Sequence, residues 1–152
     1  MRQIIIIAFL FFSGFSGAED KPILTLKLGD KVIDLSYEDI FKFTPVEHTM
    51  DNIWVDKTTT YTGVKLSDIV QKYKITSEWL KLTAINDYVT KVPTTDADKG
   101  AFIAYLSDGK QMKIRDKGPL WLLYPFGENK ALDIDIYHDR SIWQLKLIES
   151  LE

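Results

Sequence analysis

The sequence predicts an α+β domain in which short strands dominate, arranged as mixed sheets or a barrel, with a few short helices between them. Two observations lead to this prediction. Short apolar segments recur along the chain, and turn signals such as Asp108-Gly109 separate them. Helical spacing, in contrast, covers only brief stretches. No internal repeat or linker interrupts the pattern, so we expect a single domain over residues 19–152.

Residues 1–18 have the pattern of a cleavable signal peptide. Arg2 supplies a positive charge, Ile4–Phe12 is an unbroken apolar run, and small residues lead up to Ala18, after which we expect cleavage. The run is shorter than the ~20 residues that a membrane-spanning helix needs, and an uncleaved anchor is the alternative. We therefore expect an exported, periplasmic mature protein that does not insert into the membrane. A secreted extracellular protein would carry the same signal.

The mature chain opens with a predicted hairpin and a short helix. Ile23–Leu28 alternates between apolar and polar residues, Gly29-Asp30 marks a turn, and Val32–Leu35 forms the second arm. Ser36, with Asp39 three positions later, resembles a capping box and predicts a helix through Phe41.

The remaining elements are mostly strands. Thr44–Thr60 is polar and shows no sustained period, so we expect a long irregular segment, which in a compact domain is usually functional or disordered. Leu66–Tyr73 has apolar residues at helical spacing. Further strands are predicted over short apolar segments: Leu80–Ile85, Tyr88–Pro93, Phe102–Leu106, Met112–Arg115, Leu120–Tyr124 and Trp143–Ile148.

Composition excludes several classes of function. The net charge is -3 with the two signs interspersed, so neither nucleic acid nor an anionic membrane surface is an expected partner. The chain has no cysteine and two histidines, His48 and His138, and their spacing supports no zinc site. Serine-nucleophile and phosphate-binding glycine motifs are absent. Asp133 and Asp135 are expected as solvated charges on a loop or strand edge, and His138 as a surface residue.

Three clusters combine polar and aromatic residues. The first, Asn86-Asp87-Tyr88, is equally typical of a plain turn. The second runs from Arg115-Asp116 through Gly118-Pro119, which fixes the backbone, to Trp121. The third is Arg140–Leu145, where Trp143, Leu145 and Leu147 are expected to form the core face of a strand, leaving Arg140, Ser141 and Gln144 for polar contacts.

In this order along the chain, these clusters resemble the sulfite oxidase-type molybdopterin-binding domain. The resemblance also includes Tyr61–Leu66 before a helix and Asp108-Gly109, and it covers nearly all of the mature chain. In the enzymes of that family, a cysteine in the segment after the first helix binds molybdenum. Here that segment, Val46–Tyr61, contains no cysteine. The departure puts the family's oxo-transfer chemistry in doubt, but it leaves a pterin pocket possible.

The sequence is similar to a smaller branch of this fold, which consists of exported, cysteine-free pterin-binding sensors. That resemblance implies a reduced pterin as ligand and no molybdenum. It also implies a partner, the periplasmic part of a membrane enzyme that makes or breaks a cyclic dinucleotide (c-di-GMP), and an effect on biofilm formation. Two other interpretations stay open: a molybdopterin-dependent oxidoreductase or redox subunit with a non-cysteine metal ligand, and a scaffold protein whose pocket has decayed.

The chemistry of a pterin selects the candidate site residues. Its flat ring would stack on Trp54 first, then on Tyr88 or Trp121. Its 2-amino and N3–H edge would donate to Asp87 or Asp116. Its 4-oxo and N5 side needs donors, for which the candidates are Arg115, Arg140, Ser141 and Asn86. Trp143 is the remaining ligand-binding candidate. Trp121 and Trp143 have an alternative place in the core, and Arg115 and Asp116 could simply pair with each other at the surface.

Overall fold

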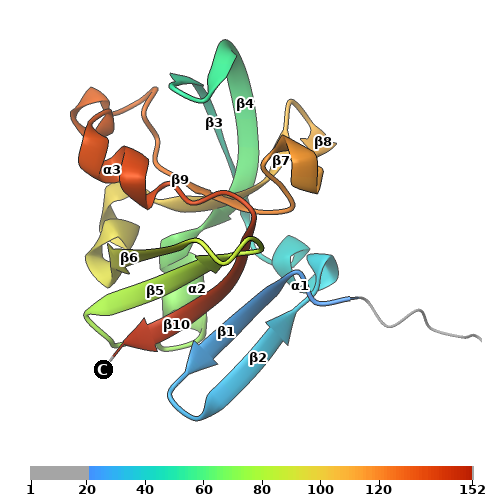
Figure 1. The fold of residues 1–152 in the computed structure, drawn as a ribbon, viewed down its shortest axis with the longest axis vertical. Helices are drawn as coiled ribbons and strands as arrows, with labels where there is room; N and C mark the ends of the chain where they lie inside the picture. The colour runs from blue at the N-terminus through green and yellow to red at the C-terminus, as the bar shows by residue number, and fades with distance from the viewer. Residues whose placement is uncertain (1–20, 152) are drawn as a thin grey trace, which may run out of the picture.

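The computed structural model describes residues 21–151, and the predicted signal peptide lies outside them. Two sheets and a few short helices make up this part of the chain (Figure 1). The α+β, strand-rich prediction is confirmed. The first sheet is mixed, because β1 runs parallel to β10 while its other pairs are antiparallel. Within residues 21–151 neither sheet closes into a barrel.

The first sheet has the strand order β2-β1-β10-β5-β6. Its apolar residues alternate, as in Leu24 and Leu26 of β1 and Leu80 and Leu82 of β5, and these side chains are buried. The strands are β1 (Leu24–Leu28), β2 (Lys31–Leu35), β5 (Trp79–Ala84), β6 (Val89–Pro93) and β10 (Leu145–Leu151).

The second sheet has the order β3-β4-β7-β8, with β9 paired to β7. The Asp108-Gly109 turn joins β7 to β8 as predicted, with positive φ at both residues. The strands are β3 (Pro45–Asn52), β4 (Val55–Lys65), β7 (Phe102–Ser107), β8 (Lys110–Gln111) and β9 (Trp121–Leu123).

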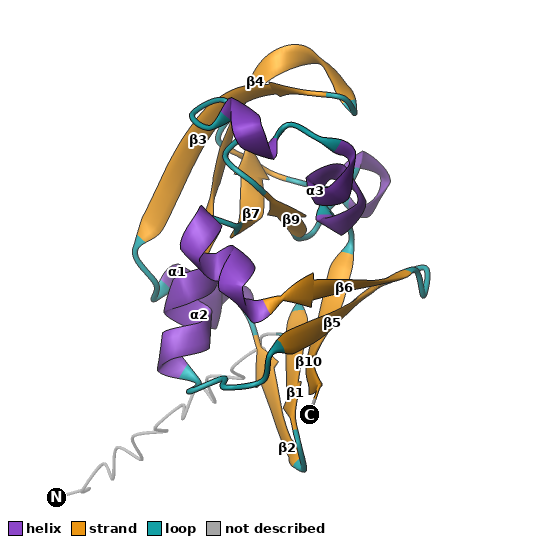
Figure 2. Ribbon diagram, turned by 90° about the vertical axis from the view of Figure 1, so that its left-hand side faces the viewer, coloured by secondary structure: helices purple, strands orange, loops and turns teal. Residues whose placement is uncertain are grey.

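Helices flank the two sheets. Helices α1 (Tyr37–Phe41) and α2 (Leu66–Lys72) lie together on one side of the molecule, whereas α3 (Asp135–Arg140) lies on another (Figure 2). The capping box of α1 is formed as predicted, because Asp39 N–H donates to Ser36 Oγ and Ser36 N–H donates to Asp39 Oδ2. Three short 3₁₀ helices complete the fold: η1 (Thr94–Lys99), η2 (Ile114–Asp116) and η3 (Lys130–Leu132). Helix α3 and the 3₁₀ helices were not predicted.

The irregular segment predicted over Thr44–Thr60 is wrong. These residues form most of a long antiparallel hairpin, β3–β4. Most of its side chains are exposed or half-buried, so polar residues and threonines occupy both faces and no apolar period is visible in the sequence. The hairpin turn contains Ile53 and Trp54.

Two further predicted strands differ from the structure. Met112–Arg115 is not a strand: β8 precedes it and η2 overlaps its end. In the last strand, a bulge between Leu145 and Leu147 shifts the pairing with β5, so Ile148 is buried instead of Leu147. Trp143 lies before this strand and forms an isolated bridge with Trp121.

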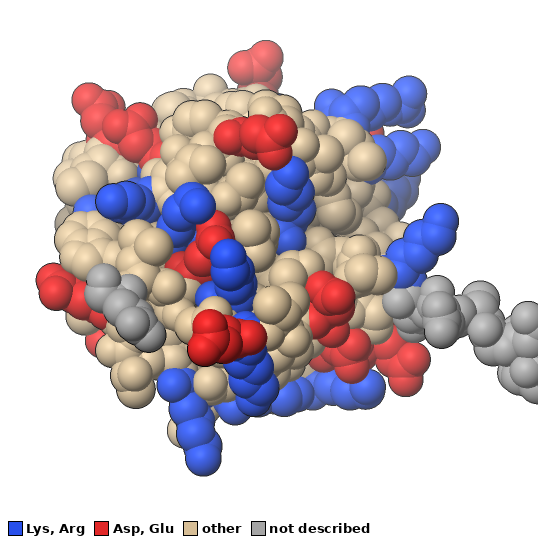
Figure 3. Space-filling view, turned by 60° about the horizontal axis from the view of Figure 1, so that its bottom comes forward, with Lys and Arg blue, Asp and Glu red and all other residues tan. Residues whose placement is uncertain are grey.

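Charged side chains of both signs cover the face shown in Figure 3, with several Lys or Arg side chains projecting together at its right-hand edge. None of the helices in residues 21–151 has the length and apolar character needed to cross a membrane.

Candidate functional site

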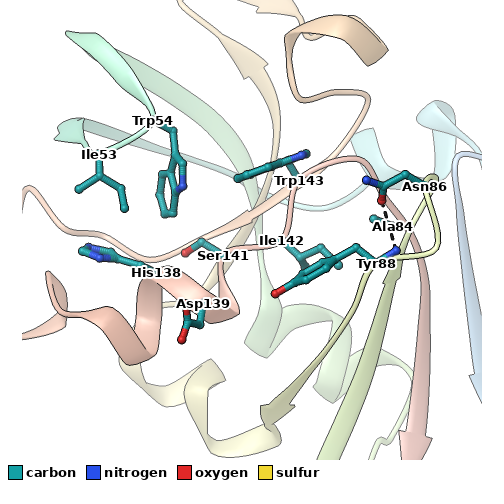
Figure 4. A pocket seen from close by; sticks show the side chains of 10 residues that line it. All are labelled: Ile53, Trp54, Ala84, Asn86, Tyr88, His138, Asp139, Ser141, Ile142 and Trp143. Carbon is teal, nitrogen blue, oxygen red and sulfur yellow. Dashed lines mark hydrogen bonds between the residues drawn. The ribbon is translucent and has the colours of Figure 1, made fainter.

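A pocket of about 310 Å³ opens where three chain segments meet (Figure 4). The segments are the β3–β4 turn, the β5–β6 turn, and the stretch from the end of α3 to the start of β10. The volume is at the lower end of the ~300–1,000 Å³ typical of small-molecule sites. The lining residues are Ile53, Trp54, Ala84, Asn86, Tyr88, His138, Asp139, Ser141, Ile142 and Trp143.

Aromatic rings form one wall of the pocket. The Trp54 ring lies edge-on to Trp121, with 5.4 Å between ring centroids, and to Trp143 at 6.3 Å. Trp121 is buried behind them, and its indole N–H donates to the Ser141 carbonyl at 3.2 Å. Its predicted alternative place in the core is therefore correct, and it supports the wall without lining the pocket. Trp143 is 37% exposed, so the same alternative does not hold for Trp143.

The β3–β4 turn holds Trp54 in this wall. The Trp54 backbone N–H donates to Asn52 Oδ1 at 3.1 Å, and Asn52 Nδ2 donates to the Tyr61 hydroxyl at 3.0 Å. Tyr61 is itself in the core, and burial raises the pKa of its phenol, which keeps that oxygen neutral as a hydrogen-bond acceptor. The indole is thus fixed by a local hydrogen-bond chain as well as by ring contacts.

Polar groups face the aromatic wall. The exposed Tyr88 belongs to the β5–β6 turn, where the Tyr88 N–H donates to Asn86 Oδ1 at 3.2 Å, which leaves the Asn86 NH₂ group for other acceptors. The Ser141 hydroxyl donates to the Tyr137 carbonyl at 2.7 Å, so its oxygen lone pairs remain available. Asp139 supplies the carboxylate of the lining. The pocket therefore presents both donors and acceptors.

His138 also lines the pocket, so its predicted surface position is wrong. Its side chain is packed against Trp54 and Phe126, with centroid distances of 5.6 and 5.4 Å. Its Nε2 lies 2.9 Å from Asp133 Oδ1, which fixes the ring orientation. Asp135 is fully exposed, as expected of a solvated charge, but it begins helix α3 and does not lie on a strand edge.

The structure brings together half of the predicted ligand-binding residues. Trp54, Asn86, Tyr88, Ser141 and Trp143 all line the pocket. Three other candidates lie outside its lining. Asp87, at the β5–β6 turn with φ +64°, points to solvent and pairs with Lys146 at 2.7 Å. Arg115 and Asp116 pair with each other at the surface at 3.6 Å, which is the alternative given above.

Arg140 lies outside the lining as well, and it serves the core. Its Nη1 donates to Asp96 Oδ2 at 2.9 Å, and Asp96 is fully buried. The Tyr124 hydroxyl donates to the same oxygen at 2.7 Å, and Lys99 Nζ contacts Asp96 Oδ1 at 2.7 Å. Burial raises the pKa of Tyr124, which keeps this donor protonated. We name these four residues the Asp96 network; it ties η1 and β9 to the end of α3.

Sequence reasoning missed five of the lining residues: Ile53, Ala84, His138, Asp139 and Ile142. Asp139 immediately precedes the predicted Arg140-Ser141 pair, and that adjacency was the available signal. His138 had no comparable signal, because its ring neighbours Trp54 and Phe126 come from the β3–β4 turn and from the segment after β9. Asp96 was missed for the same reason.

The chain offers no thiolate to the metal of a molybdopterin cofactor, because its 152 residues include no cysteine. Residues 21–151 contain no group of three or more His, Cys, Asp or Glu side chains placed to hold a metal ion. The aromatic wall and the facing polar groups do fit a flat heteroaromatic ring with donors and acceptors on its edge.

Comparison with solved structures supports the predicted fold. The chain is similar to a chain of the sulfane dehydrogenase SoxCD from Paracoccus pantotrophus, with a TM-score of 0.61 and 14% sequence identity. The similarity covers 86% of this chain and 38% of that one, so this chain spans well under half the length of its neighbour. The chain thus shares its fold with part of that sulfane dehydrogenase chain. No model of a protein family and no curated protein sequence matches the chain.

Proposed function

We propose that this protein is a non-catalytic pterin-binding module that is exported to the periplasm. In this proposal it reports its ligand state to the periplasmic part of a membrane c-di-GMP enzyme and so affects biofilm formation. The signalling role comes from the resemblance stated above. The pocket supports the ligand class, because aromatic and polar side chains lie opposite one another in a cavity of about 310 Å³.

The observation that carries the proposal is the pairing of exposed aromatic faces with one carboxylate. Trp143 and Tyr88 both expose ring surface at the pocket, and stacking on such rings contributes about 0.5–1.5 kcal/mol beyond area burial. The Asp139 carboxylate can accept from the two donors of a 2-amino-4-oxo pteridine edge. For the opposite edge the Asn86 NH₂ group remains as a donor, and the Ser141 oxygen remains only as an acceptor, because its proton goes to the Tyr137 carbonyl.

Anaerobic titration with tetrahydrobiopterin tests the proposal, with quenching of tryptophan fluorescence as readout. We expect saturable binding at one site. Asp139→Asn should weaken it about tenfold or more, because a hydrogen bond to a charged group contributes about 1.5–3 kcal/mol. Trp143→Ala should weaken it about threefold to tenfold.

Matched controls exist for both variants. Trp79 is as exposed as Trp143 but lies on β5 outside this pocket, so Trp79→Ala should leave the affinity unchanged. Asp87→Asn is the control for Asp139→Asn, because the Asp87 carboxylate is exposed outside the pocket lining, and it should also leave the affinity unchanged. Absence of saturable binding, or equal losses in the controls, would contradict pterin binding here. Stoichiometric molybdenum in the purified protein, measured by elemental analysis, would instead favour the oxidoreductase interpretation.

A further inference from the structure

The segment Lys110–Lys117 concentrates positive charge in an acidic protein. It contains four cations, Lys110, Lys113, Arg115 and Lys117, and one acid, Asp116, whereas the whole chain has a net charge of -3. The adjacent Asp108 is occupied by Lys57 and by the backbone N–H of Thr60. Among residues 21–151 no ion pair is formed by Lys110 or Lys113. Arg115 pairs with Asp116, and Lys110 interacts electrostatically with Asp108, so the segment keeps a net positive charge.

The segment also exposes an apolar side chain among its charges. Ile114 is 58% exposed, and the neighbouring Arg115 side chain is 78% exposed. An exposed aliphatic side chain between cationic side chains suits a surface that binds a partner with both acidic and apolar residues.

The backbone under this surface is held in place. Met112 is buried in the core. The backbone at Gly118 approaches the Met112 backbone so closely that only glycine fits, because a Cβ atom on Gly118 would lie 2.0 Å from the Met112 carbonyl oxygen. The N–H groups of Asp116 and Gly118 both donate to the Lys113 carbonyl at 2.8 Å. The exposed side chains thus project from a preorganised loop, which lowers the entropy lost on binding.

Gln144 connects this loop to the pocket. Its side-chain amide donates to the Ile114 carbonyl at 2.7 Å, and its backbone N–H donates to the Lys117 carbonyl at 3.0 Å. The residue before it, Trp143, is a pocket wall, and Lys117 Nζ lies 5.7 Å from the centroid of the Trp143 ring. Gln144 itself has φ +51°, a left-handed conformation that is unfavourable for a residue other than glycine. A strained residue therefore joins the pocket wall directly to the basic loop.

We propose that Lys110–Lys117 is a docking surface for an acidic, partly apolar segment of a partner protein, and that Trp143 and Gln144 couple it to the pocket. Complementary charge attracts the segment, and Ile114 supplies the apolar contact at the centre. Ligand contact with Trp143 shifts the 113–117 backbone through Gln144. The coupling rests on the proposed function, because it needs a ligand in the pocket; the docking surface does not.

A fluorescein-labelled peptide of alternating glutamate and leucine tests the surface by fluorescence anisotropy. We expect binding that salt weakens. Lys113→Glu/Arg115→Glu should weaken it about tenfold or more, and Ile114→Ser about threefold. Lys21→Glu/Lys31→Glu changes the net charge equally at exposed positions elsewhere and should weaken binding less than about threefold. Equal losses in the two double variants, or tighter binding of a DNA duplex than of the peptide, would overturn the proposal.

Backbone amide NMR locates the contacts and separates this proposal from the one before. Peptide addition should shift the resonances of residues 110–117, and tetrahydrobiopterin should shift those of 113–117 through Gln144. If the peptide acts as expected while tetrahydrobiopterin shifts nothing, the docking surface stands and pterin binding fails. If tetrahydrobiopterin binds while the peptide leaves 110–117 unshifted, pterin binding stands and the docking surface is refuted.

Discussion

Replacing Arg140 with methionine should destabilise the whole domain, because its main partner is the carboxylate of Asp96. The substitution keeps an unbranched side chain but removes the donor 2.9 Å from Asp96 Oδ2. Asp96 is 0% exposed and the Arg140 side chain is 14% exposed, so water cannot replace the lost contact without a rearrangement. Arg140→Met therefore leaves a buried negative charge incompletely paired.

The magnitude follows from the contacts that remain. Removing one partner of a buried ion pair costs about 3–5 kcal/mol. Tyr124 still donates to Oδ2, and Lys99 still contacts Oδ1 from a side chain that is 40% exposed. These two contacts place the expected loss of unfolding free energy near the lower end, about 3 kcal/mol. Tyr124→Phe removes one hydrogen bond to the same carboxylate and should cost about 1.5–3 kcal/mol.

Urea denaturation followed by tryptophan fluorescence and by circular dichroism measures these losses. Arg115→Met is the matched control, because that guanidinium is 78% exposed and should contribute within about 0.5 kcal/mol. Asp96→Asn/Arg140→Met should be more stable than Arg140→Met alone, since the unpaired charge is then gone. An Arg140→Met protein that unfolds within about 0.5 kcal/mol of the wild type would refute the role assigned to the Asp96 network.

Two other variants test the packing of β4 and the cap of α1. Gly63→Ala should lower the unfolding free energy by about 3 kcal/mol, because the added Cβ would lie 2.3 Å from the Ile103 carbonyl oxygen. The control is Gly109→Asn, at an open turn position with positive φ, which asparagine tolerates; it should be nearly neutral in the same urea assay. The Lys42 side chain, and then Ser36, lower the pKa of Asp39 from 3.8 to about 2. The ionised Asp39 carboxylate therefore stabilises the fold above pH 3.8, and this contribution is lost as the pH falls towards about 2. The difference in urea midpoint between wild type and Asp39→Asn should therefore shrink over that interval, and a difference that is constant with pH would contradict the assignment.

Local signals explain what the sequence could predict of the fold. Helix α1 and its capping box depend on contacts within a few residues, such as Ser36 with Asp39, and both were predicted correctly. The hairpin signal at Asp108-Gly109 is equally local. The β3–β4 hairpin was missed because residues 45–60 bury only Met50 and Thr59, so this part of the chain shows no apolar period, and its strands are revealed by their pairing with each other.

The candidate site was half predictable for a related reason. Trp54, Asn86 and Trp143 were named as candidates for binding a pterin, and the fold brings them to one pocket. Whether a polar residue faces a ligand, solvent or a buried partner depends on distant contacts. Arg140 shows this limit most clearly, because its partner lies 44 residues earlier in the chain and nothing in the intervening sequence links them.

The backbone turn at Gln144 decides the position of Trp143 and therefore the character of the pocket. A regular strand from Trp143 to Ile148 would place Trp143, Leu145 and Leu147 on one buried face. The irregularity between Leu145 and Leu147 breaks that alternation, and the positive φ of Gln144 turns the chain just before it. As a result the Trp143 indole is 37% exposed and lies edge-on to Trp54 in the aromatic wall of the pocket. The same turn points the Gln144 amide at the basic loop, so one local departure from strand geometry creates both the aromatic wall and its connection to the surface.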